Sequence, residues 1–220
     1  MKKTILLFTL LCASIIGFSQ SFEGVVKVTM QALEVPADMK GYESMLKQDL
    51  TISYKPGKSK VVLKGMMGTT TVYTDSLKKE IVMLMDMMGQ KIATKTALTD
   101  DSKSPASADL KGAKITKTSE TKKIAGYNCK KAIAEMTDPE TKKKITIDIW
   151  YTEDLGTINT GSEINGILME FVMETQGMKM QYLVNSLEKK AVPESEFIIP
   201  DGYTYQDMDA LKGAFPELGK

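Results

Sequence analysis

The residue types that most often carry enzyme chemistry are scarce in this chain. Its 220 residues include no histidine, and all 29 basic residues are lysine. Without histidine there is no imidazole to act as a general base near neutral pH, to activate a serine or cysteine, or to bind zinc or copper. Without arginine there is no planar fork to hold a phosphate or carboxylate through two hydrogen bonds. We therefore assign no catalytic residue, no cofactor and no metal ligand, and we expect that the protein is not an enzyme.

Carboxylate chemistry is the exception that composition leaves open. Glu153-Asp154 and the pair Glu170 and Glu174 have the residue types of a glycoside hydrolase, which needs two carboxyl groups facing each other across a cleft. Further acidic groups lack the spacing of a 12-residue calcium loop and fit a solvated loop and a helix start: Asp100, Asp101 and Asp109, then Asp207 and Asp209. A carboxylate-dependent hydrolase is the weakest functional hypothesis.

Methionine is the chemically adaptable residue that this chain does have in quantity, with 16 copies. Methionine is unbranched and polarizable, and it recurs where a surface must fit varied apolar partners. Several methionines share one face of predicted strands with aliphatic and aromatic residues. The candidate ligand-binding residues are Met30, Met83, Met85, Ile147, Ile149, Met169, Phe171, Met173, Met178, Met180 and Tyr182. The alternative is that they form plain core, because any half-buried sheet needs an apolar face.

Two single residues also have two interpretations. Cys129 adjoins Lys130 and Lys131, which could activate its thiol, but a free cysteine is more often a small buried hydrophobe. Trp150, the one tryptophan, falls on the otherwise polar face of its strand with Thr146 and Asp148. We interpret it as a structural anchor in preference to an interface contact.

Period-two alternation of apolar and polar residues is the pattern that positions all these side chains. It predicts about nine to eleven strands, among them Lys58 to Gly65, Thr69 to Asp75 and a hairpin around Met88-Gly89. The cleanest strands are Ile145 to Tyr151, Ile167 to Met173 and Met178 to Val184. We predict a mainly β fold: one strongly curved antiparallel sheet, a half-barrel, with one or two short helices, including one at 206–215. Two packed sheets are the competing arrangement.

The N-terminus predicts export. Lys2 and Lys3 precede an apolar run from Ile5 to Phe18 and small residues near Ser19, which is the layout of a signal peptide. We expect a signal peptide at 1–19 and one β-rich domain at 20–220. Cys12 does not follow a small residue, so we expect a periplasmic or secreted protein without a lipid anchor. The near balance of lysines and acidic residues favours neither nucleic acid nor an anionic membrane as a partner, and no other segment is a transmembrane candidate.

Four strings of the sequence resemble a known family. They are Phe22-Glu23-Gly24-Val25-Val26, the run from Lys122 to Lys131, Ile149-Trp150-Tyr151-Thr152-Glu153-Asp154-Leu155 and the run from Phe197 to Tyr203. Together they resemble the DUF4412 family of exported proteins of unknown function and, more distantly, the periplasmic lipoprotein carriers (LolA/LolB-like). The resemblance implies a half-barrel whose concave side can hold acyl chains. Those carriers use an arginine in the binding region, and this chain has none.

Two functional hypotheses are therefore preferred over the hydrolase. In the first, the protein binds a lipid or the acyl chain of a lipoprotein in the concave face of the sheet. In the second, it is a structural or interaction domain of the cell envelope with a filled core and no small ligand.

The first prediction concerns export. Cleavage after Ser19 leaves Gln20 as the N-terminal residue of a protein released without a lipid anchor. Cell fractionation followed by N-terminal sequencing tests this. Recovery of a diacylated Cys12 in the membrane pellet would contradict it.

Overall fold

The computed structural model describes residues 22–66, 68–99, 110, 112–137, 144–156, 164–175 and 178–207. The predicted signal peptide, the acidic residues Asp100, Asp101, Asp109 and Asp209, and most of the predicted helix at 206–215 lie outside these residues. Within them, no helix has the length and apolar character needed to cross a membrane.

Within the described residues, alternating side chains form eleven long strands and one short one. The strands are β1 (Gly24–Glu34), β2 (Gln48–Lys55), β3 (Lys58–Gly65), β4 (Gly68–Asp75), β5 (Glu80–Met87), β6 (Gln90–Ala97), β7 (Lys114–Ile124), β8 (Tyr127–Thr137), β9 (Lys144–Thr152), β10 (Ile167–Thr175), β11 (Met178–Lys189) and β12 (Thr204–Tyr205). Three short 3₁₀ helices are η1 (Ala37–Met39), η2 (Glu43–Leu46) and η3 (Glu194–Phe197). At Met88-Gly89 both residues have positive φ, as a two-residue hairpin turn requires.

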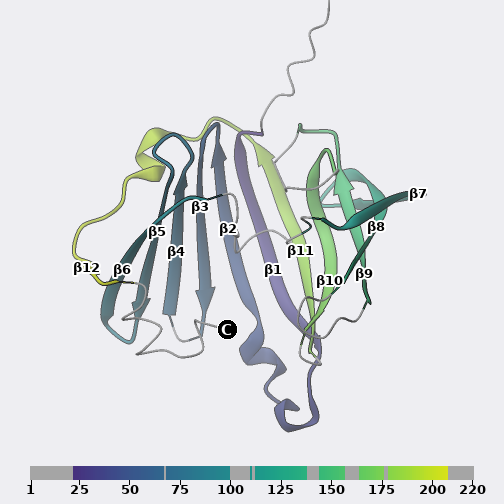
Figure 1. Ribbon diagram of the computed structural model, residues 1–220, viewed down its shortest axis with the longest axis horizontal. Coiled ribbons are helices and arrows are strands. Elements are labelled where there is room, and N and C mark those ends of the chain that lie inside the picture. The colour runs from purple at the N-terminus through teal and green to yellow at the C-terminus, as the bar shows by residue number, and fades with distance from the viewer. Residues whose placement is uncertain are drawn as a thin grey trace, which may run out of the picture.

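All twelve strands belong to one sheet, in the order β12-β6-β5-β4-β3-β2-β1-β11-β10-β9-β8-β7 (Figure 1). The strands β1 to β6 form one antiparallel meander and β7 to β11 form another. The two meanders meet where β1 pairs antiparallel with β11, with Val28 opposite Val184. Only β12, which pairs with β6, runs parallel to its neighbour. The predicted single antiparallel sheet is confirmed, and it is not closed into a barrel.

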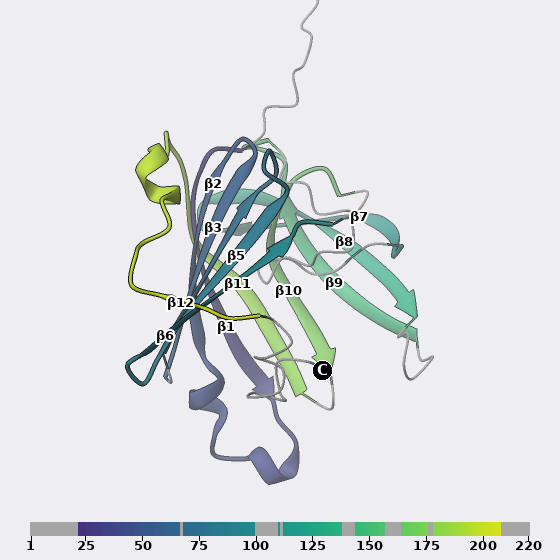
Figure 2. The same ribbon diagram turned by 60° about the vertical axis from the view of Figure 1, so that its left-hand side comes forward.

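The sheet curves around one of its faces, which we call the inner face. That face carries the main core, including Val26, Ile52, Val61, Ile149 and Phe171, all nearly inaccessible to solvent. No helical layer covers this core within the described residues, so the curvature of the sheet and its connecting segments must shield it. Figure 2 shows the strands of the two meanders inclined to each other on either side of β1 and β11. Leu110 and Ile164, from two connections, are buried in the same core.

The opposite, outer face is covered over β4 to β6 by a C-terminal strap, residues 190–205 (Figure 1). Ile199 and Tyr203 of the strap pack on a second cluster formed by Tyr73, Val82, Leu84 and Ala93. Ion pairs hold the strap at its start: Lys58 contacts Glu194 at 2.6 Å and Lys60 contacts Glu196 at 3.0 Å. Exposed pairs of this kind contribute at most about 1 kcal/mol each, so the apolar cluster is the main attachment.

Gly24 provides the prediction for the fold, because β1 and β11 approach closely there. A Cβ on Gly24 would lie 2.1 Å from the carbonyl oxygen of Glu188 and 2.6 Å from the ring of Phe22. We expect Gly24→Ala to push β1 away from β11 and to lower the free energy of unfolding by about 1–3 kcal/mol. Urea denaturation measures the change. Gly65→Ala, at a strand position with no atom within 4 Å of the added Cβ, is the control, and equal stability of the two variants would contradict the prediction.

Cys129 provides a second prediction, because the structure places it in the core with no exposed surface. Burial raises the pKa of its thiol. Of the adjoining lysines, Lys130 contacts Glu153 and Lys131 contacts Asp148 and Glu120, so both charges are neutralised away from the sulfur. The folded state keeps the thiol proton to higher pH than the unfolded chain, so this contribution to stability falls as pH rises above about 8.5.

We therefore expect Cys129 to react slowly with a thiol reagent at neutral pH and fast in denaturant. Spectrophotometric titration of the native and denatured protein compares the two rates. Rapid, complete labelling of the native protein would contradict the structural role.

Candidate functional site

The strand register brings the predicted ligand-binding residues to the inner face of the sheet. Five of them are members of the main core: Ile147, Ile149, Met169, Phe171 and Tyr182. Met30, Met83 and Met173 pack against that core from its margin. Met85 forms a small cluster with Ile92 on the same face of β5 and β6. Met178 and Met180 continue the inner face of β11 beyond Tyr182.

Solvent exposure divides these residues into two groups. Six are buried, and Ile149 and Met169 have no exposed surface at all. The other five are half-buried: Met30, Met83, Met173, Met178 and Met180. Met169 is therefore a plain core residue, whereas the half-buried methionines remain within reach of a ligand.

Four of the half-buried methionines lie together where β1 and β10 end and β11 begins, at the bottom of Figure 1. Met180 stands directly opposite Met173 on β10, and Met178 lies two residues earlier on the same face of β11. On its other side, Met180 is diagonal to Met30 of β1, which pairs with Tyr182. We call Met30, Met173, Met178 and Met180 the methionine rim. On each strand, fully buried residues lie one or two positions from the rim.

A pair of aromatic rings separates the rim from the deeper core. Phe171 and Tyr182 stack with ring centroids 4.6 Å apart and planes 12° from parallel. Burial raises the pKa of Tyr182 far above its ordinary value and that of Tyr54 to about 12. Both phenols therefore stay neutral throughout the physiological range, and neither adds charge to the inner face.

A second half-open region of the inner face lies on β5 and β6, around the predicted residues Met83 and Met85; its members Ile92 and Thr94 were not among the candidates. Met83 and Met87 pack against Met85 and Ile92 there. Thr94 of β6 pairs with Met83 of β5, and its side chain is almost fully buried. Within the part of the chain that the structure describes, Thr94 Oγ1 is the one buried side-chain polar atom without a hydrogen-bond partner. The alternation of Ile92 and Thr94 with Ala93 and Lys95 was the available signal.

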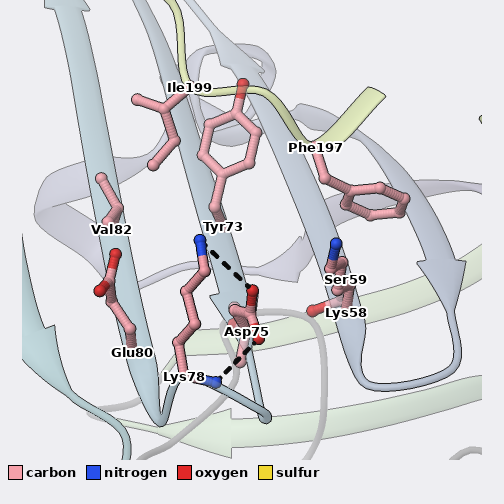
Figure 3. A pocket seen from close by; sticks show the side chains of 10 residues that line it. Lys58, Ser59, Tyr73, Asp75, Lys78, Glu80, Val82, Phe197 and Ile199 are labelled. Carbon is pink, nitrogen blue, oxygen red and sulfur yellow. Dashed lines mark hydrogen bonds and ion pairs between the residues drawn. The ribbon is translucent and has the colours of Figure 1, made fainter. Parts of the chain in front are cut away.

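An open pocket on the outer face was also not predicted. It lies between the strap and β3 to β5, with an empty volume of about 420 Å³ that includes open solvent (Figure 3). Its walls include Tyr73, Val82, Phe197 and Ile199. Its charged groups already have partners: Lys58 pairs with Glu194, Lys78 with Asp75 and Glu80 with Lys95. The first of these ion pairs attaches the strap, and the other two join residues of β4 to β6 and their connections.

The outer face of β7 to β11 carries a polar network around Trp150. Lys122 Nζ lies 4.3 Å from the centre of the Trp150 ring and forms an ion pair with Glu170. Gln181 donates a hydrogen bond to Glu170 at 3.1 Å, and Lys131 contacts Asp148 at 2.8 Å. Trp150 is thus half-buried beneath lysine side chains, as the predicted structural anchor would be.

Two of the four carboxylates considered for hydrolysis, Glu153 and Glu170, are engaged in ion pairs. Glu153 accepts a hydrogen bond from Lys130 at 2.5 Å, and Glu170 is held by Lys122 and Gln181. Among the described residues, no three or more cysteine, aspartate or glutamate side chains gather where they could hold a metal ion. The inner face with its methionine rim is therefore the candidate functional site.

Comparison with known proteins places the chain in a family. The family model described as "N-glycanase peptide, N-terminal domain" matches residues 46–207. No curated protein matches. The DUF4412 resemblance is not among these findings and stays a prediction.

The chain is also similar to solved structures, at low identity. PNGF-II in a C2 crystal form is 17% identical with a TM-score of 0.46, over 86% of this chain and 32% of that one. PNGF-II in a P21 form is 18% identical with a TM-score of 0.45 and the same coverage. LprF from Mycobacterium bovis is 13% identical with a TM-score of 0.42, over 82% of this chain and 90% of that one. The chain thus spans about a third of the length of PNGF-II. The family match, by contrast, covers about three quarters of the present sequence, and the chain therefore belongs to the family of the N-glycanase peptide N-terminal domain.

Proposed function

We propose that the protein is an exported, non-enzymatic binding protein that holds a hydrophobic ligand, a lipid or the acyl chain of a lipoprotein, against the inner face of its sheet. One observation carries the proposal. Large apolar side chains that are continuous with the core stay half-exposed on the inner face, among them Met30, Leu63, Met83 and Met173.

Half-exposed side chains of this kind suit an adaptable apolar ligand. Burying apolar surface contributes roughly 25 cal/mol per Å², so a chain laid over the rim gains affinity from each methionine that it covers. Methionine has three rotatable bonds and can adjust to ligands of differing shape. The fully buried residues behind the rim hold it in place.

Thr94 supports the same proposal from the other end of the inner face. A buried hydroxyl without a partner costs about 1–3 kcal/mol. An ester or carboxyl oxygen of a bound amphiphile could accept a hydrogen bond from Thr94 Oγ1 and remove that cost. The hydroxyl lies beside Met83, so the polar contact and the apolar surface adjoin.

The second candidate function is an interaction domain with a filled core. Ile149 and Met169 have no exposed surface, so much of the inner face is packed by side chains. The family is named for an N-terminal domain, and PNGF-II is about three times as long as the matching region. In this alternative, the methionine rim contacts another domain or protein.

The absence of catalysis is part of the proposal. The family name belongs to a domain of an N-glycanase, and this chain lacks histidine and arginine. Its best-placed carboxylates, Glu153 and Glu170, are occupied by lysines. These observations favour binding as the activity.

Met173→Asp tests the proposed function. Met173 is half-buried on the inner face, so the charge stays solvated and the free energy of unfolding should change by about 1 kcal/mol or less. The same charge at fully buried Met169 should cost several kcal/mol. We expect Met173→Asp to lose binding of a fluorescent fatty acid while its thermal unfolding stays close to that of the wild type.

Val172→Asp is the matched control, because Val172 is equally half-buried on the opposite face of the same strand. It should bind the fatty acid as the wild type does. Wild-type protein that never binds the probe, or equal losses in both variants, would favour the interaction domain.

A further inference from the structure

The methionine rim gathers soft donor atoms as well as apolar surface. Met173 and Met180 face each other across β10 and β11, a relation that puts their Cβ atoms about 4.5–5.5 Å apart. Met178 and Met30 are each diagonal to a member of that pair, at about 7–8 Å, within reach of long side chains. Flexible side chains at these spacings can bring three thioether sulfurs to one point, with Met180 at the centre.

We infer that the methionine rim is a binding site for a soft monovalent metal ion, Cu(I). Thioether sulfur is a soft donor that selects Cu(I) over harder ions. Zn²⁺, by contrast, requires thiolate, imidazole or carboxylate ligands. The sulfurs are neutral, so a singly charged ion leaves less charge to be solvated at a half-buried position than a divalent one would.

The surroundings of the rim suit such a site. The stacked rings of Phe171 and Tyr182 close its deeper side, which keeps water from that direction. The open side faces solvent, so an ion can enter without a change in the fold. Of the other soft donors, Cys129 is fully buried, and the exposed methionines Met45, Met66 and Met88 lie on other segments of the chain.

This inference can be tested separately from the binding of a hydrophobic ligand. Met180→Leu keeps the apolar volume of the side chain and removes its sulfur. Fatty-acid binding is measured separately on the metal-free wild type, which tests the proposed function without the ion. Failure of metal binding and failure of fatty-acid binding are therefore seen in different measurements.

The experiment is an anaerobic competition for Cu(I) between the purified protein and the chromogenic chelator bicinchoninate. We expect the wild type to withhold one Cu(I) per chain and Met180→Leu to bind it about tenfold or more weakly, since even indirect support of a metal ligand is commonly worth that factor. Thioethers release no proton on binding, so the affinity should not change between pH 6 and 8.

Met83→Leu is the matched control, a half-buried methionine of the same face on β5. It should bind Cu(I) as the wild type does, and so should Cys129→Ala. A wild type that withholds no Cu(I), an unchanged affinity in Met180→Leu, or an equal loss in Met83→Leu would each overturn the assignment of the site.

Discussion

The pairing of β1 with β11 is the interaction on which the rest of the structure depends. Each meander has an apolar inner face, and neither has a helical layer to cover that face within the described residues. Joining them edge to edge gives a sheet wide enough to curve over its own side chains. The join is also apolar on the inner face, where Val26 and Val28 of β1 lie beside Leu187 and Val184 of β11. At Gly24 the two strands approach so closely that the join requires a residue without a side chain.

Alternation in the sequence predicted the strands well because their side chains face different environments on the two sides. Ile145, Ile147 and Ile149 alternate with polar residues, and β9 follows that pattern. Alternation contains no information about which edges meet, so the pairing of β1 with β11 could not be predicted from it. The parallel strand β12 was missed for a related reason: two exposed residues have no periodicity, and their place is set by the strap's packing on Tyr73 and Val82.

The sequence predicted which face of the sheet carries the candidate site. It did not predict which residues of that face are buried and which are exposed. Met169 and Met173 have the same residue type and the same orientation in the sequence pattern. The structure buries the first completely and leaves the second half-exposed, because β9 pairs with β10 only as far as Phe171 and Met173 lies beyond that pairing. Coverage by the neighbouring strand thus decides which of these two methionines belongs to the core and which to the rim. Thr94 was missed because a threonine in an alternating strand normally finds a partner, and its isolation is visible only in three dimensions.

The position of β1 at the centre of the sheet has a consequence for how the chain folds. The partners across the β1–β11 join are roughly 150 residues apart in sequence, whereas every other long pair of strands closes a hairpin or a short connection. Loop-closure entropy makes such distant contacts late events, so each meander can form from local pairings before the two come together. Synthesis from the N-terminus makes β1 first and β11 nearly last. Until β11 arrives, the backbone of β1 offers an unsatisfied edge to any other strand, and the interval between the two is when the protein is most open to aggregation.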